Sequence, residues 1–466
     1  MDDETQREAP LLASDGHVVP APDTVACEQM EVCTDGAVVD AGMDPGGGEA
    51  EPKRAEVKTA SVGVTLINVV CNVIGGGVLA LPTAFNQSSL FLGVLLLAGM
   101  TMLAVVNLMF IVLCAEHTKT FNYLKLLHDA FGDRLARIVD VALVMFPFGA
   151  LVAYCRATAD AMPPVMVNFF GIDRDAFLAS QGAWFLFGSI CFFVLSCRRS
   201  LSELLVSSIF GIATIMWAIS IVVFRFFDGS YSTTHTAAEV DHELEVVYLH
   251  KDIFRTIPVI TFALSAHNNA PAYYHELADR SPARIAKAFV GGNVIIFTAY
   301  VLIGIFGLLT FGPRIASAKG NILDAYAEDD GLMNSARFVI FIHFACVFPI
   351  LQMAARRGFN NLVFGHNEFP LKWLCVESFF IVCAATGLAA VVPDIDVVLS
   401  YSGAIFGSII VLIAPSALYI KLRPLREHPH DFKICVVAGV SSVLGVVVGI
   451  ISTVITTIDI ASGDEG

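Results

Sequence analysis

Two stretches of the chain place helix-breaking or polar residues inside long apolar runs. The first, residues 68–82 with the sequence NVVCNVIGGGVLALP, carries Gly75, Gly76 and Gly77 in a row. Each glycine destabilises a helix interior by about 1 kcal/mol relative to alanine. In a bilayer, unwound backbone is tolerated only where it is buried in protein or lines a cavity. The run therefore predicts a discontinuous helix whose free N–H and C=O groups face a ligand.

The second stretch, residues 261–274 with the sequence TFALSAHNNAPAYY, puts Ser265, His267, Asn268 and Pro271 in the middle of another apolar run. Pro271 removes a backbone donor, and the polar cluster would be costly in hydrocarbon unless it faced a cavity. Two interrupted helices, each opening a five-span half of opposite orientation, are typical of an inverted-repeat transporter whose site lies at the bilayer midplane.

The composition of the chain is that of an all-α polytopic membrane protein. Its 466 residues are 56% hydrophobic and 15% charged, which is too apolar for a soluble protein. Apolar runs of spanning length predict eleven transmembrane helices, five in each half and one appended. They fall near residues 60–85, 88–115, 138–167, 182–197, 203–227, 253–277, 285–312, 335–355, 371–392, 397–420 and 433–458.

These runs divide the chain into five predicted parts. They are an acidic tail (1–57), a first inverted repeat (58–227), a loop (228–252), a second inverted repeat (253–422) and a last span with a short C-terminus (423–466). The tail holds 14 acids against 3 bases and is rich in Gly and Pro, so we expect it to be disordered. Its Glu8-Ala-Pro-Leu11-Leu12 is one residue short of the acidic dileucine pattern that sorting adaptors bind, so a sorting adaptor or a signalling protein is a candidate partner.

The distribution of Lys and Arg predicts the orientation of the spans. With the N-terminus in the cytoplasm, 20 of these residues fall in inside segments and 7 in outside segments. This bias predicts a cytoplasmic N-terminus and an extracellular or lumenal 228–252 loop. The plasma membrane is favoured, and an endolysosomal or vacuolar membrane is the alternative.

The first break resembles that of the amino acid/auxin permease family of the APC superfamily, and within it the sodium-coupled neutral amino acid transporters. The family's N-V-V-N-x-V-I-G-S-G-I-x-G-L-P is similar to residues 68–82. The resemblance extends over residues 61–422 and implies a LeuT-like fold of five plus five helices with alternating access. Further matches are Phe262-x4-His267-x-Asn269, Leu309-Thr-Phe-Gly312, Phe348-Pro349 and Pro415-Ser-Ala-Leu-Tyr-Ile-Lys-Leu422.

The resemblance implies an amino-acid substrate whose carboxylate and amino groups meet the unwound backbone of both breaks. Half-helix N-termini suit a carboxylate, and C-terminal carbonyls suit an ammonium group or a cation. Close helix packing is the alternative role of the glycines. Neither break holds an acidic residue, so a neutral amino acid is favoured over a cationic one. The candidate substrate-binding residues are Asn72, Gly75, Gly76, Gly77, Tyr154, which resembles the family's third-span tyrosine, Ser265, His267 and Asn268.

The candidate coupling ion follows from two departures from the family. There, sodium is held between an Asn of the first span and a Thr or Ser of the eighth. Here Cys71 and Val347 stand at those positions, and Asn72 is displaced by about 100° around a helix. A hard cation prefers oxygen ligands, so a proton is favoured over sodium. The candidate ion-coupling residues are Asn72, His267, His343 and Arg156.

Each ionisable candidate also has a structural alternative. His343 lies one helical turn before Val347, and histidine titrates near pH 6–7. Either His343 or His267 could instead be a neutral imidazole bonded to a backbone carbonyl. Arg156 precedes Asp160 by four residues, so a helical ion pair is the simplest interpretation, with a stand-in for the missing cation or an anchor for a carboxylate as alternatives.

The sequence thus predicts a secondary active transporter of neutral amino acids in a lipid bilayer, coupled to protons. A sodium-coupled symporter is one alternative, and an amino-acid sensor that signals through the acidic tail is another. Neither a cofactor, a protein-bound metal nor a nucleic acid is expected. An enzyme is disfavoured because the sequence contains neither His-Glu-x-x-His nor Gly-x-Ser-x-Gly.

Overall fold

The computed structural model describes residues 60–197, 204–231, 251–366, 369–392, 394–422 and 431–462. Within these ranges the chain is helical apart from turns and one β-bridge between Ala60 and Leu277. The all-α class is therefore confirmed. The predicted acidic tail and most of the 228–252 loop lie outside the described residues.

The helices follow the predicted spans in order, with several of them longer than predicted. Helix α5 begins at Asp133 rather than at residue 138, and α12 runs on to Phe364 rather than to residue 355. The short helix α4 was not predicted. The elements are α1 (Val62–Val73), η1 (Gly76–Ala80), α2 (Leu81–Ser88), α3 (Leu90–Thr118), α4 (Tyr123–Phe131), α5 (Asp133–Asn168), η2 (Phe177–Ala179), α6 (Gln181–Ser196), α7 (Leu204–Phe227), α9 (Ile253–Ala263), η4 (His267–Asn269), α10 (Ala270–Glu276), α11 (Pro282–Phe311), η5 (Gly312–Ala318), η6 (Ile322–Ala325), α12 (Gly331–Phe364), α13 (Leu371–Val391), α14 (Ile395–Tyr401), the π-helix η7 (Ser402–Ile413), α15 (Ala414–Leu422) and α16 (Asp431–Ser462).

The predicted count of eleven spans is not confirmed. Eight helical segments of the described chain are long and apolar enough to cross a bilayer, and the α1/α2 pair, bent by 55°, makes a ninth. Helix α6 has only 16 residues. The predicted sixth span is divided between α9 and α10, of 11 and 7 residues. By length and composition, eight or at most nine segments of the described chain therefore qualify as spans, and α6 and the α9/α10 pair are too short to be counted.

Both predicted interruptions are present, and their residues explain where each helix stops. Helix α1 ends because Ile74 (ψ 106°) and Gly75 adopt extended backbone. Pro82 lies in the first turn of α2, where its missing N–H is not needed for the helix. Pro271 takes the same place in α10, after the break that follows α9. Proline thus begins the second half-helix of each broken span.

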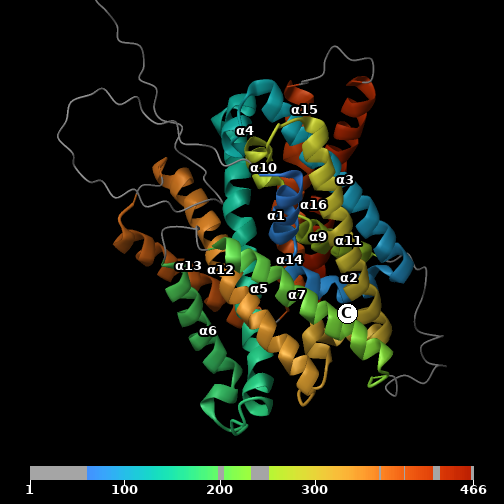
Figure 1. The fold of residues 1–466 in the computed structure, drawn as a ribbon, viewed down its shortest axis with the longest axis vertical. Coiled ribbons are helices and arrows are strands. Elements are labelled where there is room, and N and C mark those ends of the chain that lie inside the picture. Colours follow the sequence, from blue (N-terminus) through green and yellow to red (C-terminus); the bar gives the residue numbers. More distant parts are fainter. Residues whose placement is uncertain are drawn as a thin grey trace, which may run out of the picture. The chain divides into compact units, whose positions relative to one another are not determined.

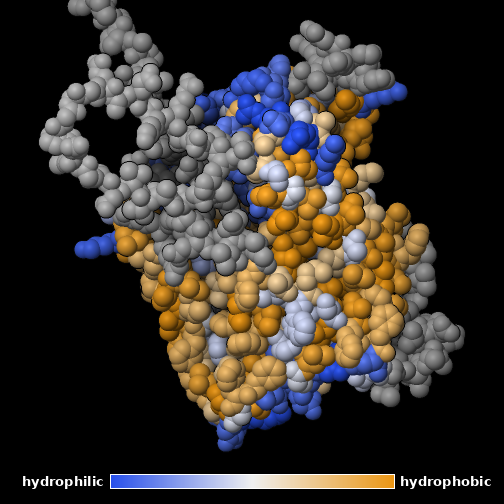
Figure 2. Space-filling view, viewed as in Figure 1, coloured by the Kyte–Doolittle hydropathy of each residue, from blue (hydrophilic) through white to orange (hydrophobic). Residues whose placement is uncertain are grey.

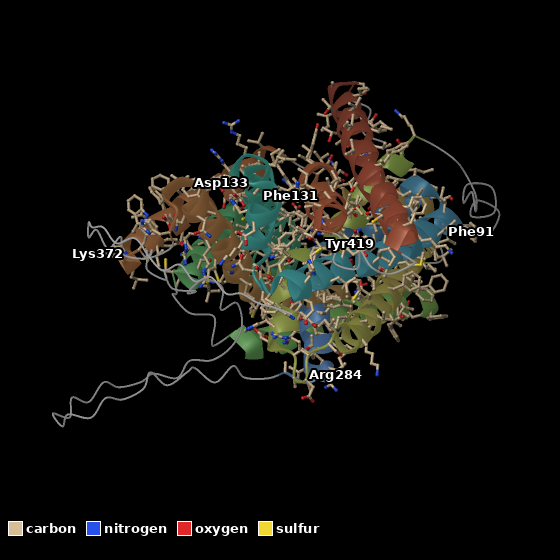
Figure 3. The ribbon with its side chains drawn as sticks, turned by 90° about the horizontal axis from the view of Figure 1, so that it is seen from above. Phe91, Phe131, Asp133, Arg284, Lys372 and Tyr419 are labelled. Atoms are coloured by element: carbon tan, nitrogen blue, oxygen red, sulfur yellow. The ribbon has the colours of Figure 1, made fainter. Side chains whose placement is uncertain are left out.

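The body built from these helices has two polar ends and an apolar middle. Figure 1 shows α4, α10 and α15 near one end, called the α4 end below, and the α5–α6 connection at the opposite end. Figure 2 shows hydrophobic residues over the middle of the visible face and hydrophilic residues towards both ends. In the view from above, Phe91 and Lys372 lie near opposite edges, while the buried Tyr419 lies between them (Figure 3). This distribution fits a multi-pass membrane protein.

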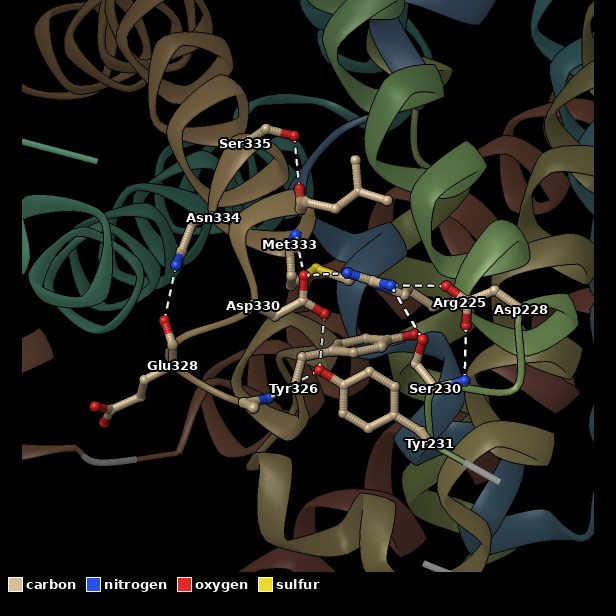
Figure 4. Close-up of polar contacts among 12 residues, drawn as sticks. Arg225, Asp228, Ser230, Tyr231, Tyr326, Glu328, Asp330, Met333, Asn334 and Ser335 are labelled. Carbon is tan, nitrogen blue, oxygen red and sulfur yellow. Dashed lines mark hydrogen bonds and ion pairs between the residues drawn. The ribbon is translucent and has the colours of Figure 1, made fainter. Parts of the chain in front are cut away.

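A partly buried polar cluster fixes the segments at the end opposite α4. Asp330 caps α12 by accepting from the Met333 N–H at 3.0 Å, and it also accepts from Arg225 at 2.5 Å and from Tyr231 Oη at 2.8 Å (Figure 4). Nearby, Arg337 is buried and donates to the carbonyls of residues 323, 326 and 327. The segment before α12 is thereby held to α7 and α12.

At the other end, α4 is fixed to α5 by a histidine between two carboxylates. His128 Nδ1 lies 2.9 Å from Asp133 Oδ1, and its Nε2 lies 3.0 Å from Asp140 Oδ2. Partial burial lowers the pKa of His128, but hydrogen bonds and charge from Asp133 and Asp140 outweigh it, so the net pKa is raised. Only the protonated imidazole can donate from both nitrogens. Because α4 contacts η4, this clamp supports the second break.

We expect the stability that His128 contributes to depend on pH. Its folded pKa lies above the ordinary value of about 6.5, so the contribution is complete below pH ~6.5 and is lost as the pH rises through the folded pKa. Melting temperatures of wild type and His128→Gln in detergent should differ most at acidic pH and converge at alkaline pH. His117→Gln, at an exposed position near the end of α3, is the control. A difference that stays constant with pH would contradict the role of charge.

Candidate functional site

A small cavity lies where the first break meets α5, α9, α12 and α14. The break contributes Gly76 and Gly77, and α5 contributes Tyr154. These three are the predicted substrate-binding residues that the structure brings together at the cavity. The complete lining is Gly76, Gly77, Leu79, Ala153, Tyr154, Ala157, Phe262, Gly320, Phe344, Ile395 and Leu399.

Tyr154 occupies the polar end of this cavity. Its hydroxyl oxygen accepts from the Gly76 N–H at 3.2 Å, and its ring stacks on Phe344 with the centroids 4.2 Å apart. A Cβ on Gly76 would overlap Tyr154 Cε1 and lie 3.3 Å from Phe344 Cε1. Only glycine at position 76 allows the aromatic pair to close over the unwound backbone. A predicted anion-binding N–H is therefore present, and a protein hydroxyl covers it.

Gly77 and Gly75 have different surroundings. A Cβ on Gly77 would lie 3.3 Å from Ala263 Cβ and 3.3 Å from Phe262 Cδ1, so this glycine lets the two broken spans pack closely. Gly75 is outside the cavity lining, and a Cβ there would lie 3.0 Å from the Tyr154 hydroxyl. The glycine run thus serves close helix packing as well as cavity formation.

The ends of α1 and α9 meet at a residue that the sequence analysis did not identify. The Tyr300 hydroxyl, on α11, lies 3.0 Å from the Val73 carbonyl oxygen and 2.8 Å from the Ala263 carbonyl oxygen. These carbonyls belong to the last residues of the two half-helices, and Tyr300 is fully buried. The sequence offered one signal for Tyr300, which is the single tyrosine in the apolar run 285–312. Tyr300 joins the two breaks directly.

The polar residues of the second break point elsewhere. His267 is fully buried, and its Nε2 donates to the Ala104 carbonyl oxygen at 3.1 Å, which is the structural alternative stated above. Asn268 Nδ2 donates to Asn269 Oδ1 at 3.1 Å. Neither these residues nor Ser265 lines the cavity, and Phe262 forms that wall instead. The expected polar wall opposite the glycines is therefore apolar in this structure.

The candidate ion-coupling residues do not gather at one point. His343 Nδ1 donates to the Gly211 carbonyl oxygen at 3.1 Å and lies 3.3 Å from Thr214 Oγ1. The buried Nε2 of His343 has no hydrogen-bond partner in the described part of the chain. Asn72 is exposed and does not line the cavity. Arg156 Nε donates to Asp160 Oδ2 at 2.8 Å, which is the predicted helical ion pair.

Contacts between spans lie beside the cavity on the side opposite α4. Asp396, in the first turn of α14, accepts from Gln87 Nε2 at 2.9 Å and from Arg255 Nη2 at 2.9 Å. Gln87 belongs to α2 and Arg255 to α9, so one carboxylate connects the first, sixth and tenth predicted spans. The Ile395 N–H also donates to the Lys319 carbonyl at 3.1 Å.

A second set of contacts closes the α4 end. The Ala60 N–H donates to the Glu276 carbonyl at 2.7 Å, and the Ala278 N–H donates to the Ala60 carbonyl at 2.9 Å. Arg280 lies over the Phe121 ring with its Cζ 4.5 Å from the centroid. The start of α1 is thereby fixed to the end of α10.

Comparison with known proteins identifies related chains. The family model described as transmembrane amino acid transporter protein matches residues 58–455. The putative sodium-coupled neutral amino acid transporter 11 of Bos taurus is 24% identical over 412 residues, 88% of this chain and 86% of that protein. The putative sodium-coupled neutral amino acid transporter 10 of Xenopus laevis is 25% identical over 77% of this chain and 34% of its own length.

A solved structure shares the fold. The substrate-bound outward-open state of a Na+-coupled sialic acid symporter matches with a TM-score of 0.51 at 14% identity, over 86% of this chain and 93% of that one. The likeness confirms the LeuT-like fold class expected from two interrupted helices.

We expect Gly76→Ala to open the cavity. The added methyl group overlaps the Tyr154 ring, so Tyr154 must move and the Gly76 N–H loses its acceptor. A cysteine introduced at Ala157, on the cavity wall, should then react with a water-soluble thiol reagent at least ~10-fold faster, as quantified by peptide mass spectrometry. Gly99→Ala, where a Cβ meets no neighbour within 4 Å, is the matched control. Equal labelling rates in both backgrounds would show that Tyr154 does not close the cavity.

Proposed function

Because the chain belongs to the transmembrane amino acid transporter family, we propose that it is a secondary active transporter that moves neutral amino acids by alternating access. The observation that carries this proposal is the small cavity at the meeting point of two broken helices, with a backbone N–H at its polar end. A substrate carboxylate would replace the Tyr154 hydroxyl at the Gly76 N–H, where the helix end carries partial positive charge. Tyr154 would then be free to donate to the same carboxylate.

A neutral substrate is supported by the charges around the cavity. No acidic or basic side chain belongs to the described lining. Arg156 is one residue from Ala157 of the wall, but its guanidinium is engaged by Asp160 at 2.8 Å. A cationic or anionic substrate side chain would have no counter-charge there, and burial of an unpaired charge is strongly unfavourable.

We further propose that the coupling ion is a proton taken up by His343. Its Nδ1–H is committed to the Gly211 carbonyl, so Nε2 is the basic nitrogen, and it has no hydrogen-bond partner among the described residues. Val347, one turn further along α12, supplies no oxygen for a metal cation. Sodium is the second candidate ion because the relatives from Bos taurus and Xenopus laevis are named as sodium-coupled.

We place the N-terminus of this multi-pass membrane protein in the cytoplasm, on the bias of 20 inside against 7 outside Lys and Arg residues that results when all eleven predicted spans, α6 and the broken α9/α10 pair included, cross the membrane. The α4 end is then cytoplasmic, and the end that holds Asp330 and Asp396 is extracellular or lumenal. The plasma membrane remains the favoured location. An amino-acid sensor would depend on the acidic tail, and no contact of the described residues favours it. Deletion of residues 1–55 should therefore leave transport unchanged.

Uptake into proteoliposomes tests the function and the ion together. An inward pH gradient should drive accumulation of labelled neutral amino acids, whereas an imposed sodium gradient should not. His343→Gln should lower pH-driven accumulation at least ~10-fold and retain exchange of internal for external substrate, because exchange involves no net movement of protons. His117→Gln, at an exposed site, should behave as wild type. Accumulation that follows sodium, or that survives in His343→Gln, would overturn the assignment of the ion.

A further inference from the structure

We infer that the residues lining this cavity, which has a volume of about 10 Å³ in this structure, form the side-chain compartment of an amino acid with an apolar side chain once the cavity opens for substrate, and that Leu399 limits the size of side chain it accepts. This inference rests on the proposed transport function and narrows its substrate class. It excludes substrates such as glutamine and serine, which are neutral but polar.

The first step is the chemistry of the walls. The side chains that line the cavity are aliphatic or aromatic, among them Leu79, Phe262, Phe344, Ile395 and Leu399. The Tyr154 hydroxyl is the single polar side-chain group of the described lining, and it is engaged at the Gly76 N–H. In the proposed function, this polar end of the cavity binds the carboxylate of the substrate. No hydrogen-bonding side chain is left in the lining for a polar substrate side chain.

The second step is that neighbouring polar groups are committed elsewhere. Asp396 lies between Ile395 and Leu399 in sequence, but it accepts from Gln87 and Arg255. Asn268 is bonded to Asn269, and Arg156 is bonded to Asp160. A polar side chain in the cavity would lose its hydrogen bonds to water without replacement, which opposes binding.

The third step is that each phenylalanine ring of the cavity wall packs against a second aromatic ring. The Phe344 ring stacks on Tyr154 at 4.2 Å, and the Phe262 ring packs on Phe146 at 4.8 Å with an interplanar angle of 35°. Both supporting rings come from α5. Rings held in pairs make poor candidates for adjusting the cavity to substrates of different size.

Among the aliphatic residues of the wall, Leu399 is the one that we propose sets the size. It comes from the first turns of α14, is 1% exposed and closes the cavity beside Ile395. The wall next to it is backbone: Gly320 has φ +82°, and a Cβ there would lie 2.5 Å from the Asp396 nitrogen. That backbone contact cannot recede without breaking the link between the Lys319 carbonyl and α14. Shortening Leu399 is therefore the direct way to enlarge the compartment.

A competition assay with the purified, reconstituted wild-type protein tests the substrate class. Labelled leucine is the probe, and unlabelled leucine, methionine, phenylalanine, glutamine, serine and lysine are the competitors. We expect the apolar amino acids to inhibit at concentrations at least ~10-fold lower than glutamine or serine, as expected for a site without partners for their polar groups. Glutamine or serine that inhibits as well as leucine would overturn the inference and leave neutral amino acid transport intact. Absence of any amino-acid binding or uptake would instead overturn the proposed function.

The size limit is tested with Leu399→Ala. The ratio of phenylalanine to leucine uptake should rise about 10-fold, because the removed methyl groups leave room for a ring. Leu388→Ala, on α13 at a position 44% exposed, is the matched control and should keep the wild-type ratio. An unchanged ratio in a Leu399→Ala protein that still transports leucine would overturn the role of Leu399. If that variant does not fold, Leu399→Val measures the same ratio with a smaller loss of volume.

Discussion

The arrangement of the site depends on one hydroxyl group between two helix ends. The last carbonyls of α1 and α9, from Val73 and Ala263, both face the Tyr300 hydroxyl, at 3.0 and 2.8 Å. Helix C-termini carry partial negative charge, so two of them brought together in a buried place repel unless a donor lies between them. A hydroxyl has one hydrogen for two acceptors, so it can donate to the last carbonyl of either half-helix. Gly76 and Phe262 share a cavity because this link keeps the two breaks adjacent.

The same link explains why glycine residues are concentrated next to it. Once α1 and α9 end at one point, the chain that leaves them must pass close to its neighbours. Gly77 packs on Ala263, and Gly76 lies against the Tyr154 ring. Close packing and ligand access are therefore not competing explanations of the glycines. The cost of glycine in a helix is also small here, because the chain at Gly75 is extended rather than helical.

The sequence predicted the two breaks correctly and the cavity wall only in part. Glycine and proline act on the local backbone, so Gly75 to Gly77 and Pro271 mark where helices must stop. The direction of a polar side chain after a break depends on tertiary contacts instead, and His267 turns to the Ala104 carbonyl rather than to the cavity. Leu399 gave no signal because an apolar residue in an apolar run is expected whether it faces lipid, core or ligand.

The proposed role of His343 in proton coupling depends on the contact between two helices. The Nδ1–H bond to the Gly211 carbonyl spans from α12 to α7, and a Cβ at residue 211 would lie only 3.2 Å from that nitrogen. The two helices are thus closely packed where the imidazole lies. A proton on Nε2 would add a buried charge at this contact, and such a charge must find a partner or water. Separation of α7 from α12 would admit water to it. In the proposed function, protonation of His343 and the distance between these helices would therefore be linked by the same buried contact.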